Sequence, residues 1–272
     1  MRAPVPHSPD IAVIGGGHAG LEAALAARRL GCSVALISLR LDKLGEMSCN
    51  PAIGGLGKGQ IVCEIDALGG AMGRLADETG IQFKMLNGGK GAAVRGPRCQ
   101  SDRHKYREAA TETVRSAGID LIEGAAEGLL LEGNRVRGVR LADGREVRAG
   151  AVVVTTGTFL RAVMHTGDSQ SSGGRVGEGT TAGISGDLAR LGLVLGRLKT
   201  GTPPRLARSS IRWEALEANG GDARPTPFSA ATDRARFPRL PQVDCHITYT
   251  NERTHELIRA NIHRAPMYAG RI

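Results

Sequence analysis

The sequence predicts an α/β fold, and two stretches near its start carry the prediction. Residues 11–14 are a short β-branched strand that enters a glycine-rich turn, and an alanine-rich helix follows over residues 21–30. Residues 33–37 are a second buried strand. Residues 10–38 therefore form one strand–helix–strand unit, whose crossover helix requires the two strands to pair in parallel.

The turn in this unit carries the Gly-x-Gly-x-x-Gly pattern at Gly15, Gly17 and Gly20. The first glycine permits the tight turn, the second lets the backbone approach a pyrophosphate, and the third lets the helix pack closely on the sheet. The free N–H groups and the positive dipole end of a helix N-terminus attract phosphate, so the pattern predicts a dinucleotide site. Ser38 stands where an acidic side chain usually holds the ribose, so a serine hydroxyl or a backbone group has to do this.

A second region, residues 129–160, predicts a β-meander that leads into a buried strand. Short strands at 129–131, 136–141 and 146–148 are separated by glycine-containing turns. The apolar strand 151–155 follows, and it ends in Thr156-Gly157, where small residues allow close approach to a ligand. Together with the glycine turn, this order resembles the two-dinucleotide-fold flavoproteins, which have an FAD-binding Rossmann-like domain.

Between these regions, residues 45–59 predict a long glycine-rich loop. A phosphate-binding P-loop is excluded, because Ala52 stands where that motif needs glycine and Gly59 follows Lys58 where it needs serine or threonine. We expect the loop to fold against the flavin and to place Cys49 beside it. From its chemistry alone, Cys49 is either a nucleophile or a small buried apolar residue.

The composition limits the class of protein. The chain has 272 residues, 36 of them basic and 27 acidic, and 41% are hydrophobic, which excludes intrinsic disorder of the whole chain. No apolar run approaches the roughly 18 residues that span a membrane, and the prolines of residues 1–10 do not fit a signal peptide, so we expect a cytoplasmic protein. Five cysteines without a Cys-x-x-Cys pair indicate reduced thiols, and no metal site is predicted.

The basic charge is concentrated in residues 84–107, which hold seven basic side chains and one acidic side chain. Such a cluster is suited to binding phosphates. The alternative is that these side chains cap, stack on or solvate a helix face. The candidates for contact with nucleic acid are Lys90, Arg95, Arg98 and Arg103.

Several strings of residues resemble one known family. They include Gly-Gly-Gly-His-Ala-Gly at 15–20, Met-Ser-Cys-Asn-Pro-Ala-Ile-Gly-Gly at 47–55, Leu-Lys-Thr-Gly-Thr-Pro-Pro-Arg at 198–205, and further stretches at 64–70, 82–87, 157–160 and 250–255. These strings are similar to the GidA family of tRNA-modifying flavoproteins, also called MnmG. The resemblance covers essentially the whole chain.

The resemblance implies a function in tRNA modification. The family enzyme binds FAD and works with a tRNA modification GTPase (MnmE) in a heterotetramer. It attaches a carboxymethylaminomethyl-type group to C5 of the wobble uridine of certain tRNAs. Methylenetetrahydrofolate supplies the carbon, NADH reduces the flavin, and the family protein is a homodimer.

The resemblance also implies roles for particular residues. Cys49 matches a cysteine proposed to act in catalysis, with the alternative that it only shapes the flavin loop. The residues expected to bind FAD are Gly15, Gly16, Gly17, His18, Ala19 and Gly20 at the pyrophosphate, and Ala126 and Thr181 at two further contacts.

Family members are more than twice as long as this chain, so we expect a truncated chain with two parts. Residues 1–199 would be the incomplete first part of the FAD-binding domain, and residues 200–272 the start of an inserted substrate or NADH domain. Within the second part, residues 246–250 predict a strand and Asn251 the cap of the next helix. Two alternatives stay open: a folate- and FAD-dependent tRNA uridine methyltransferase, and a non-catalytic fragment that binds FAD or tRNA.

Overall fold

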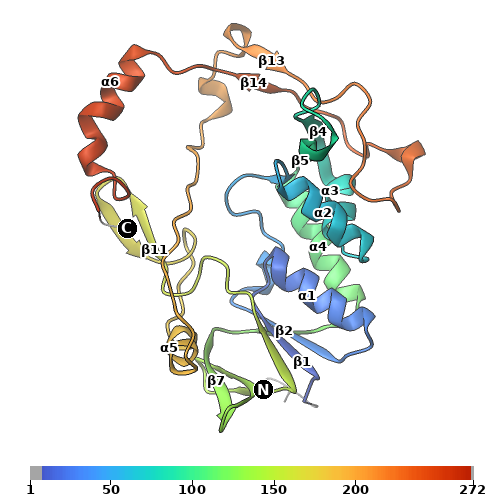
Figure 1. Cartoon of the computed structure of the whole chain (residues 1–272), viewed down its shortest axis with the longest axis vertical. Helices are drawn as coiled ribbons and strands as arrows, with labels where there is room; N and C mark the ends of the chain where they lie inside the picture. Colours follow the sequence, from blue (N-terminus) through green and yellow to red (C-terminus); the bar gives the residue numbers. More distant parts are fainter. Residues whose placement is uncertain (1–7, 271–272) are drawn as a thin grey trace.

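The computed structural model describes residues 8–270, and its central element is a four-stranded parallel sheet (Figure 1). In spatial order the strands are β10 (Ala151–Val154), β1 (Ile11–Ile14), β2 (Val34–Ser38) and β6 (Asp120–Glu123). Helix α1 (His18–Arg29) connects β1 to β2, and helix α4 (Arg103–Ser116) precedes β6. The predicted α/β class, the parallel strand–helix–strand unit and the strand at 151–155 are confirmed.

Alternate residues of the central strands face two different cores, because successive side chains of a strand point to opposite sides. Val13 and Leu36 pack with the apolar faces of α1 and α4. Ala12, Ile14 and Ile37 pack with the meander on the other side. Burying one such aliphatic side chain contributes about 1.5–3 kcal/mol to the stability of the fold. The two cores therefore hold the helices on one face of the sheet and the meander on the other.

The predicted meander is present and covers one face of the sheet. Its strands are β7 (Ala126–Glu132), β8 (Arg135–Leu141) and β9 (Glu146–Arg148), and they pair antiparallel in sequence order. Helix α5 (Gly183–Arg190) packs on β7, where the buried carboxylate of Asp187 accepts the backbone N–H of Leu129 at 2.6 Å. This hydrogen bond ties α5 to the meander.

A second, antiparallel sheet lies beyond α1 in the order β3-β5-β4. Its elements are β3 (Ala52–Gly54), α2 (Lys58–Ala67), α3 (Met72–Thr79), β4 (Gly80–Leu86) and β5 (Gly96–Ser101). The stretch 45–59, which we expected to be loop throughout, contains β3 and the start of α2. The reason is tertiary: Ile53 pairs with Cys99 of β5, and Gly57 adopts the left-handed φ of +71° that starts the helix.

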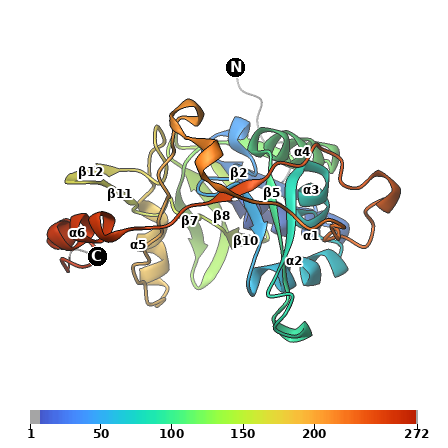
Figure 2. The same cartoon turned by 90° about the horizontal axis from the view of Figure 1, so that it is seen from above.

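The last third of the chain is extended. A hairpin of β11 (Val163–Thr166) and β12 (Ser169–Ser172) precedes α5, and residues 193–207 then run without helix or strand. The elements that follow are β13 (Glu217–Asn219), β14 (Cys245–Ile247) and α6 (Glu252–Asn261), with single turns of 3₁₀ helix at 208–210, 213–215, 234–236 and 262–264. Two further 3₁₀ turns lie earlier in the chain, at 41–43 and 92–94. Figure 2 shows α1 to α4 gathered at one end of the molecule and α6 with the hairpin at the other.

Two predictions in this part are tested directly. Asn251 caps α6 as predicted, since its side chain accepts the N–H of Thr254 at 3.0 Å. The strand predicted at 246–250 is shorter than expected, because only Cys245–Ile247 pairs with β13. The ends of the two predicted domains, residues 1–7 of the first and 271–272 of the second, lie outside the described residues. Among residues 8–270, no helix is both long and apolar enough to cross a membrane.

The segment between β13 and β14 returns to the second sheet. The N–H groups of Asp222 and Val243 donate to the carbonyls of Phe83 and Ile81 in β4, at 2.8 and 2.7 Å. Residues 228–232 are held by the buried carboxylate of Asp77 on α3. It accepts hydrogen bonds from three donors: the N–H groups of Phe228 (2.8 Å) and Ser229 (2.9 Å) and the hydroxyl of Thr232 (2.6 Å).

We expect Asp77→Ala to lower the free energy of unfolding by about 1–3 kcal/mol, because two buried N–H groups lose their acceptor. Part of this loss is offset, because the variant no longer has to bury an ionised carboxylate. The cost of burying that charge is reflected in the pKa of Asp77, which burial raises. Urea unfolding at pH 7 measures the change. Asp66→Ala is the matched control, because Asp66 accepts a single hydrogen bond of 3.2 Å from Ala230. Equal losses in the two variants would contradict this account.

Candidate functional site

The glycine turn between β1 and α1 is packed so tightly that only glycine fits at two positions. A Cβ atom on Gly15, whose φ is +108°, would lie 2.2 Å from the carbonyl oxygen of Thr155 at the end of β10. A Cβ atom on Gly20 would lie 1.8 Å from the carbonyl oxygen of Gly15. The turn therefore seats the N-terminus of α1 directly on the carboxyl ends of β1 and β10.

The same N-terminus is open toward solvent. Gly17 is the N-cap residue of α1, no side chain caps the helix there, and no acidic residue lies in its first turn. A Cβ atom on Gly17 would meet no atom within 4 Å, and both Gly17 and Ala19 are exposed. Uncapped N–H groups at the positive end of a helix dipole fit a pyrophosphate.

His18 and Gly16 shape the walls of this turn. Burial lowers the pKa of His18, so its imidazole is neutral at neutral pH, and its ring lies 5.4 Å from that of Tyr106. Its Nε2 atom is buried without a hydrogen-bond partner in the described part of the chain. A Cβ atom on Gly16 would lie 2.8 Å from Oγ of Ser38, so the turn and the end of β2 are in close contact. The residues present fit a dinucleotide cofactor such as FAD.

An acidic side chain for the ribose is missing after β2, and the structure places one on the neighbouring strand. The hydroxyl of Ser38 donates to the carbonyl of Arg40 at 3.1 Å. Glu123 of β6 is in register with Ser38, and its carboxylate accepts the N–H of Leu41 at 3.1 Å. Sequence spacing cannot find Glu123, since only the pairing of β2 with β6 brings it to this position.

The two further predicted FAD residues are both buried. Ala126, at the start of β7, belongs to the core that also contains Ile14 and Ile37. Thr181 pairs with Leu160, shortly after β10 ends, and its N–H donates to the carbonyl of Phe159 at 3.0 Å. The structure therefore packs both residues into the interior.

The predicted catalytic residue, Cys49, is half-buried in the loop before β3. Its Sγ lies 3.6 Å from Oγ1 of Thr202, and the guanidinium of Arg205 donates to its carbonyl oxygen at 2.8 Å. Arg175 donates to the hydroxyl of the adjacent Ser48 at 2.7 Å. Sequence reasoning assigned no role to Thr202, Arg205 or Arg175, although residues 198–205 were among the strings that carried the resemblance.

Two of the other cysteines have properties that argue against reactivity. Burial raises the pKa of the Cys99 thiol to about 12, so it is not ionised at neutral pH. Burial and the nearby carboxylates of Asp66 and Asp77 raise the pKa of the exposed Cys63. Within residues 8–270 no group of three or more His, Cys, Asp or Glu side chains is arranged to hold a metal ion.

In the basic stretch 84–107, some side chains are held by hydrogen bonds to other elements and others are exposed to solvent. Arg103 donates to the buried carboxylate of Glu46, and Arg107 donates to the same carboxylate at 3.1 Å. Lys84 donates to Asn219 and to the carbonyl of Gly220. Lys90 and Arg95 are exposed on the loop between β4 and β5, while Arg98 is half-buried on β5. Of the four predicted nucleic-acid contacts, Lys90 and Arg95 are thus the most exposed.

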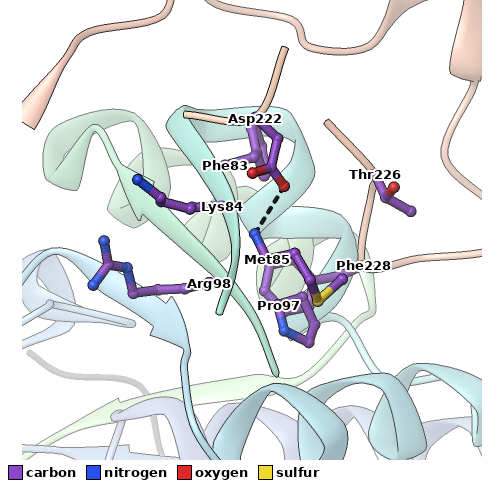
Figure 3. Close-up of a pocket in the computed structure, with 8 residues that line it drawn as sticks. All are labelled: Phe83, Lys84, Met85, Pro97, Arg98, Asp222, Thr226 and Phe228. Atoms are coloured by element: carbon purple, nitrogen blue, oxygen red, sulfur yellow. Dashed lines mark hydrogen bonds between the residues drawn. The ribbon is translucent and has the colours of Figure 1, made fainter. Parts of the chain in front are cut away.

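Arg98 and Lys84 also line a small cavity between β4, β5 and the segment after β13 (Figure 3). Figure 3 shows the carboxylate of Asp222 bonded to the backbone N–H of Met85, at 2.8 Å. The cavity measures about 10 Å³, which is room for one water molecule. It is too small for a substrate or a cofactor, so it belongs to the packing of the segment on β4.

Comparison with known proteins gives consistent matches. A family model described as "Glucose inhibited division protein A" matches residues 10–272. The tRNA uridine 5-carboxymethylaminomethyl modification enzyme MnmG of Rhodopirellula baltica is 52% identical over 97% of this chain and 42% of its own length. The enzyme of the same name from Granulibacter bethesdensis is 50% identical, over 98% of this chain and 43% of its own length.

A solved structure, that of Aquifex aeolicus GidA in its form I crystal, is also similar. It superposes with a TM-score of 0.91 at 47% identity, over 96% of this chain and 44% of that chain. The predicted fold class is confirmed by this match. The chain spans less than half the length of the relatives it matches, and it corresponds to an N-terminal portion of them.

The buried Glu46 and the two arginines that bond it, Arg103 and Arg107, make the free energy of unfolding depend on pH. Burial alone would raise the pKa of Glu46, but the hydrogen bonds from Arg103 and Arg107 outweigh it and hold this pKa below the ordinary 4.5. A carboxyl group with a lowered pKa stabilises the fold above its unfolded-state pKa, and this contribution is lost as the pH falls through the folded-state pKa.

We therefore expect Glu46→Gln to lower the free energy of unfolding by about 1–3 kcal/mol at pH 7. The variant should also lose less stability than the wild type when the pH is lowered below about 4.5. Urea unfolding at a series of pH values measures both effects. The control is Asp42→Asn, which removes the exposed ion pair with Arg40 and should leave stability nearly unchanged. Parallel pH profiles for the wild type and Glu46→Gln would refute the assignment.

Proposed function

Because the chain belongs to the GidA family, we propose that it is the N-terminal portion of an FAD-dependent enzyme that modifies uridine in tRNA. The observation that carries the proposal is the glycine turn. It joins β1 to α1 at the carboxyl end of the parallel sheet and leaves an uncapped helix N-terminus beside it. The relatives that the chain matches are named as tRNA uridine modification enzymes.

In this proposal the turn binds the pyrophosphate of FAD through backbone N–H groups. The neutral His18 fits there because its imidazole adds no charge to the turn, while its backbone N–H belongs to the open helix N-terminus. The proposed FAD contacts are Gly15, Gly16, Gly17, His18, Ala19 and Gly20, with Ala126 and Thr181 as two further ones.

Cys49 is the proposed catalytic residue. C5 of uracil is a poor nucleophile, and a thiolate that adds to C6 makes C5 electron-rich enough to accept a one-carbon unit. Loss of the C5 proton and departure of the thiolate then restore the aromatic base. When bound, the flavin supplies the electron transfer needed to fix the one-carbon unit. The position of Cys49 in a half-buried loop held by Arg175 and Arg205 supports this role.

The finer parts of the proposal follow the family. The product is a carboxymethylaminomethyl-type group on C5 of the wobble uridine, with methylenetetrahydrofolate as carbon donor and NADH as reductant. The partners are tRNA, a second copy in a homodimer, and the tRNA modification GTPase MnmE in a heterotetramer, all in the cytoplasm. We assign residues 1–199 to the first part of the FAD-binding domain and residues 200–272 to the start of an inserted domain.

We propose that tRNA contacts the basic loop between β4 and β5. Lys90 and Arg95 are its exposed cations, and the Nε of Arg95 donates to the carbonyl of Gly88 at 3.2 Å, which holds the guanidinium close to the loop. Arg98 and Arg103 are second contacts, since both are partly exposed and Arg103 keeps its bond to Glu46.

Gly17→Glu tests the cofactor site. We expect the variant to fold, because the space around Gly17 is open, and to lose bound flavin, because a carboxylate at the helix N-terminus occupies and repels the pyrophosphate. The measurement is the flavin absorbance of the purified chain relative to protein. Gly88→Glu is the control, since Gly88 is equally open and lies on the β4–β5 loop. Unchanged flavin in Gly17→Glu would overturn the FAD assignment.

Neutral substitutions test the tRNA surface. Removing one phosphate contact should reduce the slope of log K against log salt by about 0.7–0.9, so Lys90→Gln with Arg95→Gln should flatten it by up to about 2. Filter binding of tRNA at several salt concentrations measures the slope. Arg135→Gln, an exposed cation on β8, is the control. A slope that stays at the wild-type value in the double variant would exclude this loop.

A further inference from the structure

Within the string at 198–205, only Arg205 has been given a part in the proposed function so far, yet the structure lays the string against the loop that carries Cys49. Figure 1 shows the extended chain after α5 passing the loop that follows β2. The two segments are about 150 residues apart in sequence, and Thr202 and Arg205 both contact Cys49. Two consecutive prolines, Pro203 and Pro204, separate these two residues and restrict the backbone between them.

One contact involves the backbone of Cys49 and the other its side chain. The carbonyl oxygen of Cys49 accepts a charged hydrogen bond from Arg205 at 2.8 Å, which fixes the backbone. The thiol lies 3.6 Å from the hydroxyl of Thr202. A thiol can donate to a hydroxyl or accept from it, but a thiolate can only accept, so in the ionised state Thr202 has to be the donor.

The loop is held on its other side as well. The guanidinium of Arg175 donates twice to the hydroxyl of Ser48, at 2.7 and 3.1 Å. Arg175 is itself fixed by Glu178, at 2.8 Å, and lies over the ring of Phe159. After the cysteine, the carbonyl of Pro51 accepts the N–H of Ser101 at 2.7 Å. With its neighbours held this firmly, the Cys49 side chain has little freedom to leave Thr202.

We propose that Thr202 and Arg205 are positioning residues for Cys49: Thr202 is the hydrogen-bond donor to its thiolate, and Arg205 holds its backbone so that the sulfur stays beside that donor. The inference rests on the proposed catalytic role of Cys49 and gives a purpose to the 198–205 string. Both residues are exposed in the chain, so substituting them removes no buried packing.

The test is the rate at which iodoacetamide alkylates Cys49 in the purified chain, followed by mass spectrometry of the Cys49 peptide at constant pH. The thiolate displaces iodide, so the rate reports on the stabilised and oriented sulfur. We expect Thr202→Val, which keeps the shape and removes the hydroxyl, to lower the alkylation rate by roughly threefold to tenfold, because the thiolate loses its hydrogen-bond donor. Thr202→Ser, which keeps the hydroxyl and removes the methyl group, should stay within about twofold of the wild type.

Arg205 is tested in the same way. Arg205→Gln should lower the alkylation rate of Cys49, because the backbone of Cys49 loses its charged donor. Arg205→Lys retains a charged donor, so its rate should lie between those of Arg205→Gln and the wild type. Cys63 on α2 serves as the internal control in every sample, since its exposed thiol can be alkylated, although its raised pKa makes that reaction slow. A Thr202→Val rate equal to that of the wild type, or one matched by Thr202→Ser, would overturn the inference. So would a parallel change at Cys63, which would mean a general loosening of the fold.

The proposed function fails in a different experiment. Cys49→Ser in a full-length protein of the family leaves no thiol to alkylate and tests only whether tRNA modification needs the sulfur. Retained modification there would remove the catalytic role of Cys49, while the alkylation rates of the Thr202 and Arg205 variants would still decide whether these residues position the thiol.

Discussion

The structure depends on the close contact of three backbone segments at the glycine turn. The end of β1, the start of α1 and the end of β10 meet so closely that a single Cβ atom on Gly15 or Gly20 would lie about 2 Å from a carbonyl oxygen. Thr155 completes the contact, since its hydroxyl donates to the carbonyl of Ile14 at 2.7 Å. This contact places a helix N-terminus at the carboxyl end of the sheet, where parallel α/β folds bind their ligands. The Cys49 loop follows β2 from this end, while the meander covers one face of the same sheet and carries α5 on β7.

Three carboxylates, two of them buried and that of Glu22 half-buried, attach the peripheral segments to this frame. Glu22 of α1 accepts the N–H groups of Ala71 and Met72, which anchors the start of α3. Asp77 holds residues 228–232, and Glu46 joins the loop after β2 to α4 through two arginines. In each case one carboxylate serves two or more donors, which compensates for the cost of burying its charge. These hydrogen bonds add directional contacts between elements that also share one hydrophobic core.

The basic stretch shows why charge in a sequence is an incomplete guide to a binding surface. Seven cations within 24 residues suggest a single phosphate-binding patch, and the fold separates them. Arg103 and Arg107 stabilise the buried Glu46, and Lys84 holds the segment after β13. Lys90 and Arg95 are left facing solvent on a loop. Structural and binding roles are thus divided within one stretch of the chain, and each side chain's role depends on which element it meets.

The sequence by itself determined the elements whose signals are local. The strand–glycine turn–helix unit, the three-strand meander and the Asn251 cap follow from hydrophobic periodicity, from turn residues and from a capping side chain, all of which act within a few residues. Only the tertiary structure decided that Glu123 lies beside Ser38, that β3 forms inside the loop at 45–59, and that Thr202 lies beside Cys49. The physical reason is that each of these contacts joins segments distant in the chain, so the chemistry of one partner carries no information about where the other will be.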